Sequence, residues 1–409
     1  MAIRKLLFPA LSLCLLLAWF GGATELNAQN TVSLHGRVTD AAGSPLAGAQ
    51  VVVRNAETNQ TRGAVTRADG TYSLIGLAPG SYVISQVMLG YAAEERAIRL
   101  SAGQNLTLNF ALPEEAVAVR AVEGLADREA TFEVQRMDVS TPVVTTEIVN
   151  LPLNTRNTMN LAAIVPGVKT FAPTAGRSLP AVGSLPDLRF WNFYLDGVEW
   201  KSFFNGNLVG IPQTASPLPQ EAMREFRVHL NPYDAAFTRG ASFILSAESQ
   251  RGTNEFHGSV FGFGQNNDIN AHDEFQRRLR AANPNYSRAD YSRAQFGFNL
   301  RGPITRDRTF FSVSYEGQST DNTLTVAPTG TAWASFAQDY AAPTVNHTGV
   351  GRLTHHLTGA HTADVTYAAR YYDSETNYGG RLDRTAGITA TYWVHSLQLR
   401  DTYTPDANT

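Results

Sequence analysis

The side chains that could do chemistry in this sequence fall into two small clusters. One offers hard oxygen ligands for a cation, from Asp268, Asn270, Asp273 and Glu274. It lacks the glycine and the spacing of a known cation loop, so the interpretation we favour is a solvated loop. The other holds His355, His356 and His361 around a short turn, where adjacent strand residues point to opposite faces. We therefore predict no metal site and no cofactor.

The sequence also lacks the local signatures of an enzyme. It has no His-x-x-Glu or His-Glu-x-x-His spacing for zinc, no Gly-x-Ser-x-Gly elbow and no glycine-rich phosphate loop with lysine. The net charge of -3, without a basic stripe of interleaved aromatics, argues against a nucleic-acid partner. We predict a protein that moves or senses a ligand and catalyses nothing.

The first residues have the layout of a secretory signal peptide. Arg4 and Lys5 precede the apolar run Leu6–Phe20, which small residues follow. The alternative is a membrane anchor, but a helix that spans a bilayer needs about 20 apolar residues. We predict a signal peptide over residues 1–28. Its Cys14 is the only cysteine, so the mature protein would carry no thiol.

Residues 31–112 form a strand-rich block in which turn signals such as Ala42–Pro45 and Ala78–Gly80 separate short apolar runs. The predicted strands are Val32–Val38, Ala49–Val53, Gly70–Leu74, Tyr82–Met88 and Asn105–Leu112. This pattern predicts a small β-sandwich. Residues 113–149 lose the turn signals and gain charge, which is typical of a linker.

Residues 150–251 mix short periodic pieces with loops rich in proline and glycine. Thr155–Ile164 is a predicted short helix that stops at Pro166-Gly167, because proline cannot continue the backbone bonding and glycine permits the turn. Pro219–Arg224 is a second predicted helix. We predict a separate α+β domain here.

From residue 252 the sequence alternates with a period of two. The predicted strands are Glu255–Gly264, Tyr291–Arg301, Thr309–Gly317, Gly349–Leu357, Thr362–Tyr372 and Tyr392–Tyr403. Short connections, Gly302–Arg308 and Thr358–His361, alternate with long polar ones. Strands of about ten residues with such turns predict a transmembrane antiparallel β-barrel. The alternative is a soluble β-sandwich or jelly roll with long loops.

The alternation assigns the two faces of this wall. Phe296, Phe298, Val365 and Tyr367 are expected to face lipid, and Gln295, Asn299 and Asp364 are expected to face the lumen. The predicted fold class is therefore mainly β: an N-terminal β-sandwich, an α+β domain, then the first strands of a barrel over residues 252–409.

Two sets of motifs resemble known families. Gly36–Asp40, Pro45–Ala49, Ala68–Tyr72 and Leu77–Tyr82 resemble the carboxypeptidase regulatory-like domain. Asn150–Asn157 with Val165–Val168, Tyr194–Val198, Ala222–Val228 and Gln250–Gly258 resemble, in order, the plug of TonB-dependent outer-membrane receptors and its passage into the barrel. Thr155 departs from the glycine that is common in the family before the arginine, and Val117–Val122 is the best candidate for a TonB-contact segment.

The resemblance implies a bacterial outer-membrane location, periplasmic N-terminal domains and a plug over residues 150–251 that gates a barrel. The implied partners are a TonB-type energy-coupling protein, outer-membrane lipid and an unidentified ligand, with carbohydrate binding among the implied properties. The plug motif would comprise Arg156, Pro166, Gly167, Asp196 and Gly197. Because glycine accepts positive φ, Asp196-Gly197 predicts a tight hairpin turn, and as chemistry it is only a turn.

Two features of the plug keep two interpretations each. Arg156 either joins a buried ion-pair network between plug and barrel wall or has an ordinary surface role. A dense aromatic cluster surrounds the plug motif, and Trp191, Tyr194, Trp200 and Phe203 are its candidates for facing a ligand. The alternative is that these aromatic side chains pack between plug and barrel.

Two other functions stay open beside a receptor or transporter. One is a non-transporting surface protein for adhesion or docking that keeps the plug architecture. The other is an exported enzyme with an accessory sandwich. Six strands cannot bury their edges in lipid, so we expect the chain to be part of a longer gene product.

Overall fold

The computed structural model describes the chain in thirteen stretches. They are residues 31–114, 139–144, 148, 156–166, 168–171, 179–182, 191–200, 217–230, 243–272, 274–282, 290–326, 338–376 and 384–403. The predicted signal peptide and the TonB-contact candidate Val117–Val122 lie outside these residues. In the described part, no helix has the length and apolar character needed to cross a membrane.

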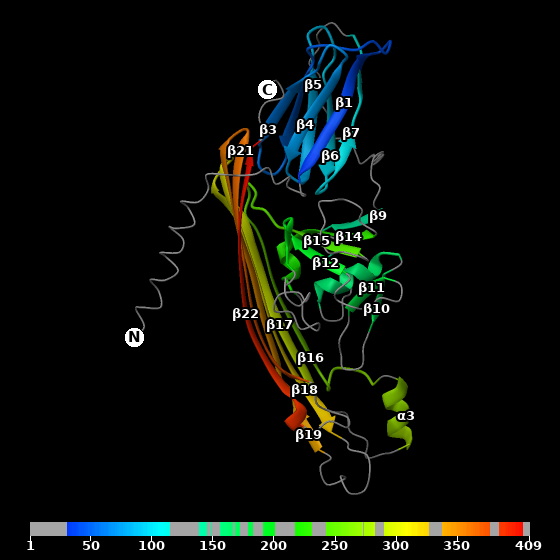
Figure 1. The fold of residues 1–409 in the computed structure, drawn as a ribbon, viewed down its shortest axis with the longest axis vertical. Coiled ribbons are helices and arrows are strands. Elements are labelled where there is room, and N and C mark those ends of the chain that lie inside the picture. The colour runs from blue at the N-terminus through cyan, green and yellow to red at the C-terminus, as the bar shows by residue number, and fades with distance from the viewer. Residues whose placement is uncertain are drawn as a thin grey trace, which may run out of the picture.

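The N-terminal block is a sandwich of two sheets, as predicted (Figure 1). One sheet contains β4 (Thr71–Leu77), β1 (Val32–Asp40), β7 (Asn105–Thr107) and β8 (Phe110–Leu112). The other contains β3 (Thr61–Val65), β2 (Gln50–Asn55), β5 (Gly80–Val87) and β6 (Glu94–Leu100). Alternate residues such as Leu34, Val51 and Ile84 are fully buried between the sheets. Strands β3 and β6 are additions to the sequence prediction, because β3 is only five residues long and charged residues dominate β6.

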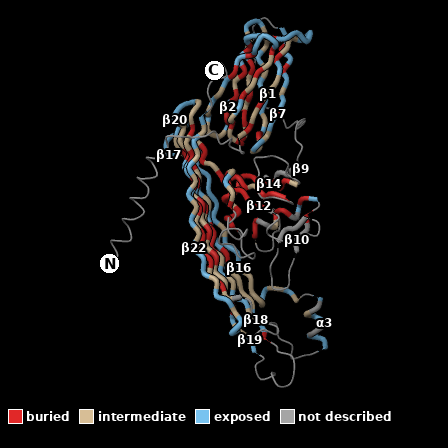
Figure 2. The backbone as a smooth tube through the Cα atoms, viewed as in Figure 1, coloured by how far each residue is buried: buried red, intermediate tan, exposed pale blue. Residues whose placement is uncertain are grey.

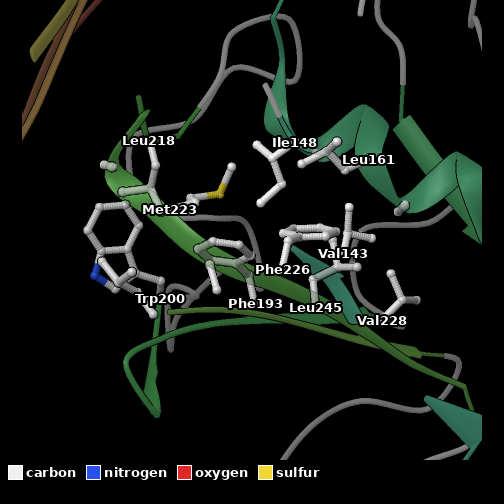
Figure 3. Close-up of a cluster of buried hydrophobic side chains, with 14 of the residues drawn as sticks. Val143, Ile148, Leu161, Phe193, Trp200, Leu218, Met223, Phe226, Val228 and Leu245 are labelled. Carbon is white, nitrogen blue, oxygen red and sulfur yellow. The ribbon is translucent and has the colours of Figure 1, made fainter. Parts of the chain in front are cut away.

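The second body is built on a mixed sheet in the order β13-β12-β15-β14-β9. Its strands are β9 (Val139–Val144), β12 (Trp191–Leu195), β13 (Val198–Glu199), β14 (Met223–Leu230) and β15 (Phe243–Ser249). A hairpin of β10 (Val168–Phe171) and β11 (Leu179–Val182) lies beside it. The apolar faces of these elements meet in one core, in which Phe193, Phe226 and Leu245 pack against Ile148 and Leu161 (Figure 3).

Both helices predicted for this body are shorter than expected and are 3-10 helices. The first, η1, spans Thr158–Ile164, and Asn160 N donates to Asn157 O in the three-residue pattern of such a helix. The segment is short and Pro166 follows it two residues later, which prevents the helix from continuing. The second, η3, is the single turn Gln220–Ala222, because the chain continues directly into β14.

The third body is a long curved antiparallel sheet in the order β16-β17-β18-β20-β21-β22, with β19 paired to β18. Its strands are β16 (His257–Asn266), β17 (Tyr291–Thr305), β18 (Thr309–Val326), β19 (Gln338–Ala341), β20 (Thr344–Thr358), β21 (His361–Thr376) and β22 (Ile388–Tyr403). All six predicted strands are present, and most are longer than expected. The sequence analysis missed β19, the helix α3 (Glu274–Ala282) and the 3-10 turn η5 (Arg384–Ala386).

The two faces of this sheet, which we call the wall, differ as the alternation predicts. On one face Phe296, Phe298 and Tyr367 are exposed by 53%, 41% and 45%. On the other face Gln295 and Asp364 are exposed by only 3% and 5%. Buried residues alternate with more exposed ones along the inner wall strands such as β18 and β20, whereas the edge strands β16 and β22 contain no buried residue (Figure 2).

The second body lies against the concave face of the wall (Figure 1). The N-terminal sandwich stands at the end of the wall where the short turns lie, since Asn59 Nδ2 is 3.3 Å from Asp307 Oδ1 and Gln60 Nε2 is 3.5 Å from Gly359 O. Helix α3 and β19 mark the opposite end. The short turns and the sandwich thus share one side.

Candidate functional site

The contact between the second body and the wall is mostly polar. Within the described residues its apolar part is small, because only Val350 and Ala368 of the wall join the hydrophobic core that the second body builds. Trp200 lies where this core meets the wall, and its Nε1 donates to Ser396 Oγ of β22 at 3.3 Å. The remaining contacts are charged or hydrogen-bonded, and they form two groups of buried polar residues.

The first group is centred on the Asp196-Gly197 turn. Both residues have positive φ, at 50° and 82°, and Leu195 pairs with Val198 across them, which makes a two-residue hairpin turn. The tight turn predicted from the sequence is confirmed. It also turns the Asp196 carboxylate inward, where Ser249 donates to it from the backbone N at 2.8 Å and from Oγ at 2.7 Å.

The wall supplies the counter-charge for this carboxylate. Arg352 Nη1 on β20 is 3.2 Å from Asp196 Oδ1, and Arg352 Nη2 is 3.0 Å from Asp364 Oδ1 on β21. Burial alone would raise the pKa of Asp196, but Arg352, Arg400 and the hydrogen bonds from Ser249 hold it below its usual value. Asp196 is therefore ionised at neutral pH and joins a buried Asp-Arg-Asp array that crosses the interface.

Glu248 lies next to this array and behaves in the opposite way. Burial raises its pKa to about 8, and the neighbouring charge of Asp196 adds to the rise. Its Oε1 is buried and has no hydrogen-bond partner within the described residues. Glu248 is therefore protonated at neutral pH, which spares the interface a further negative charge.

The second group is centred on Arg156, just before η1. Its backbone has a φ of 51°. Its Nη2 lies 2.5 Å from Glu221 Oε2 and 3.7 Å from Glu316 Oε2 of β18, and its guanidinium carbon lies 4.2 Å from the centre of the Phe261 ring of β16. Asn299 Nδ2 of β17 donates to Glu221 O at 3.4 Å. Arg156 thus joins an ion-pair network between the second body and the wall.

The aromatic candidates have different outcomes. Tyr194 and Trp200 are exposed by only 4% and 7%, and Trp200 packs in the core of the second body where it meets the wall. Their burial favours the packing alternative, and their assignment as ligand-facing residues stays a prediction. Phe203 and the side chain of Trp191 lie outside the described residues, as does Gly167 of the plug motif. Pro166 is exposed directly after η1.

The two clusters with possible metal ligands form separate local contacts. Glu274 pairs with Arg277 at 2.9 Å and with Arg278 at 2.8 Å, and Asp273 lies outside the described residues. His356 bonds Thr362, while His355 bonds Thr309 and His361 bonds Asp401. Within the described residues, no three His, Cys, Asp or Glu side chains gather where they could hold a metal ion.

Comparison with known proteins gives two domain matches and a relative. Residues 33–113 match the carboxypeptidase regulatory-like domain, and residues 249–335 match an outer membrane beta barrel domain. The TonB-dependent transporter Oar of Myxococcus xanthus is 24% identical over 264 residues, which cover 61% of this chain and 23% of that protein. The chain thus combines a carboxypeptidase regulatory-like domain with part of an outer membrane beta barrel domain.

Among solved structures, the chain is similar to the outer membrane transporter YddB of Escherichia coli, with a TM-score of 0.46 and 14% identity over 58% of this chain and 33% of that one. The siderophore receptor PirA of Acinetobacter baumannii gives a TM-score of 0.41 and 16% identity over 59% of this chain and 32% of that one. The chain spans less than a quarter of the length of Oar. Its location is the outer membrane.

Sequence reasoning singled out the residues that the second body contributes to this interface, and it missed those that the wall contributes. Arg352 and Glu316 were not singled out, and Asp364 was noted only as facing the lumen. One signal could have found them. Each is a charged residue on a strand whose neighbours alternate between polar and apolar, so each had to point away from lipid. The sequence does not say which plug residue each one meets.

Proposed function

We propose that this protein is a TonB-dependent transporter, in which the second body is a plug that a TonB-type protein displaces to admit an unidentified ligand. The N-terminal sandwich would stand in the periplasm, with lipid around the wall. The observation that carries the proposal is the Asp196–Arg352–Asp364 array, a buried ionic contact between a movable body and a fixed one.

The energetics of such a contact suit a part that moves. A buried ion pair gains little over an apolar pair of the same shape, because both charges lose their hydration. When the two bodies separate, water enters the gap and restores the hydration of the charges. Separation also exposes few apolar side chains. In the part of the chain that the structure describes, only Val350 and Ala368 of the wall would lose apolar partners from the plug core. The ion pairs thus fix one position of the plug against the wall, and water can replace them when the plug leaves.

A single cysteine at Ser249 tests this proposal in intact cells. Ser249 is 2% exposed and touches both Asp196 and Arg352, so a thiol there is shielded while the plug is seated. Ser249→Cys changes little in volume. We expect a membrane-permeable maleimide to label it faster in energised cells than in cells that lack the TonB-type protein.

Thr66→Cys is the matched control, because Thr66 is 5% exposed in the core of the N-terminal sandwich and away from the plug. Its labelling should be slow in both strains. Equal labelling of Ser249→Cys with and without the TonB-type protein would reject a plug that moves. That result would favour the alternative of a non-transporting surface protein for adhesion or docking.

A further inference from the structure

A small cavity lies where the N-terminal sandwich, the end of the plug and the wall meet. Its volume is about 40 Å³, well above the ~10–15 Å³ that one water needs. Arginines from all three parts line it: Arg62 of β3, Arg251 directly after the plug strand β15, and Arg400 of β22. The cavity is thus a shared feature of three parts of the chain.

The turn between β2 and β3 fixes the sandwich at this place. Glu57 Oε1 accepts from Arg224 Nη2 of plug strand β14 at 3.2 Å, and Glu57 O accepts from Asn254 N at 3.0 Å. Arg62 Nη2 donates to Ala360 O in a short turn of the wall at 3.4 Å. These contacts reach the plug, the start of the barrel and the wall, so they hold the cavity walls together.

The charge around the cavity is unbalanced. Asp364 is the one carboxylate among the described residues that line it, and Arg352 and Thr354 Oγ1 already bind Asp364 Oδ1 at 3.0 and 2.5 Å. Neither Arg251 nor Arg400 forms a salt bridge within the described residues. Burial lowers the pKa of Arg251 to about 10, and repulsion by Arg352 and Arg400 contributes.

We propose that this cavity binds a small oxyanion, with Arg62, Arg251 and Arg400 as its ligands. A guanidinium presents its N–H groups as a planar fork that matches a phosphate, sulfate or carboxylate group. One anion held by three arginines neutralises part of the excess charge and joins sandwich, plug and wall. By linkage, the anion favours the assembly in which the sandwich is docked, and docking favours the anion.

The test uses the purified protein in detergent, titrated with inorganic phosphate at constant ionic strength against sodium chloride. We expect a saturable rise of the thermal midpoint with phosphate, since a ligand that binds only the folded state stabilises it. Sulfate and acetate arms at the same ionic strength separate tetrahedral oxyanions from carboxylates. Arg251→Gln and Arg400→Gln should each weaken the apparent phosphate affinity at least tenfold.

Arg99→Gln is the control variant, because Arg99 is exposed on β6 of the sandwich and does not line the cavity. It should keep the parent's response to phosphate. Isothermal titration of the unmodified protein covers the case of variants that do not fold, and a saturable 1:1 binding curve is expected. A midpoint that rises equally in chloride, an equal response in the two cavity variants, or no binding heat would each overturn the proposal.

Discussion

The N-terminal sandwich and the plug bury their side chains in opposite ways. The sandwich core is mainly apolar and comes from its own part of the chain, with Leu34, Ile84 and Phe110 among its members and with no buried charged residue within the described residues of the sandwich. Its buried polar residues, such as Gln86 and Thr66, are uncharged. The plug core takes Val350 and Ala368 from the wall. The plug also buries charged side chains, of which Arg227 and Glu225 pair with each other at 2.8 Å while Asp196 depends on Arg352.

This difference teaches what each domain is built to do. A domain whose apolar surface is covered by its own second sheet is stable wherever it stands. A domain whose buried charge is neutralised by another body is stable only in place. The sandwich therefore suits a part that docks and undocks as a unit, and the plug suits a part that is released when its ionic contacts are broken.

We expect the largest effect when the sandwich and the plug are produced as separate fragments and their folding is compared. Residues 31–114 should fold alone and melt cooperatively, with a margin on the order of 0.05–0.15 kcal/mol per residue. Residues 139–250 should show no cooperative transition, because their charges lose the wall. Far-UV circular dichroism during heating measures both fragments. A cooperative melt of the plug fragment would contradict the comparison.

Arg352→Gln should release the plug from the wall. It leaves Asp196 and Asp364 buried without their counter-charge, and breaking such a buried pair costs about 3–5 kcal/mol. Hydrogen exchange in β12 and β15 should quicken accordingly. Arg384→Gln removes the exposed pair with Glu375 and is the control, where about 0–1 kcal/mol is expected. Unchanged exchange in Arg352→Gln would show that the array does not hold the plug.

The pH dependence of the plug should follow Glu248. Its pKa rises from 4.5 to about 8 on folding, so the folded state binds the proton more tightly than the unfolded state. Plug stability should thus fall as pH rises from 5 to 8, by an amount on the order of a few kcal/mol. Hydrogen exchange in β15, corrected for intrinsic rates, measures this slope.

Glu248→Gln imitates the protonated side chain and should flatten the slope. Asp196 does not interfere in this range, because its pKa is lowered on folding and its contribution is lost only under more acidic conditions. A slope that persists in Glu248→Gln would assign the titration to another group.

The smallest effect is expected from removing a single methylene group from the sandwich core, which tests how tightly that core is packed. Ile84 is fully buried, and Ile84→Val should cost about 0.5–1.5 kcal/mol by removing one methylene from a packed site. Ile75→Val is the matched control, since Ile75 is 54% exposed on the neighbouring sheet and should change stability by less than about 0.5 kcal/mol. Urea unfolding of the sandwich fragment compares the two, and equal losses would mean that the core is loosely packed.

The sequence predicted the features that depend on local pattern. Alternation placed Phe296 and Phe298 on one face of the wall and Gln295 on the other, because successive strand residues must point to opposite sides. The Asp196-Gly197 turn was equally predictable, because an Asp-Gly pair favours a two-residue hairpin turn with positive φ. Both residues have positive φ in the structure. Strand β6 escaped notice because its exposed charged residues hide the alternation.

The parts that the sequence could not predict are contacts between distant segments. Asp196 and Arg352 are separated by 156 positions, and no local pattern connects a plug turn with a wall strand. The turn alone suggested no chemistry for Asp196, and only the folded arrangement shows its carboxylate among buried charges. The same holds for Arg156, whose partner Glu316 lies on β18.

The wall strands are longer than the membrane is thick, which determines how far the wall extends beyond the bilayer. Strand β18 has 18 residues, about 60 Å of chain at ~3.3 Å per residue. Tilted by ~35–45°, it rises about 40–50 Å, whereas the apolar band of such barrels is ~25 Å tall. Since the short turns and the sandwich occupy one end, most of the excess height stands on the other, with α3 and β19. We therefore expect this part of the wall to project above the bilayer, so that a molecule that approaches from outside meets it before it meets the second body.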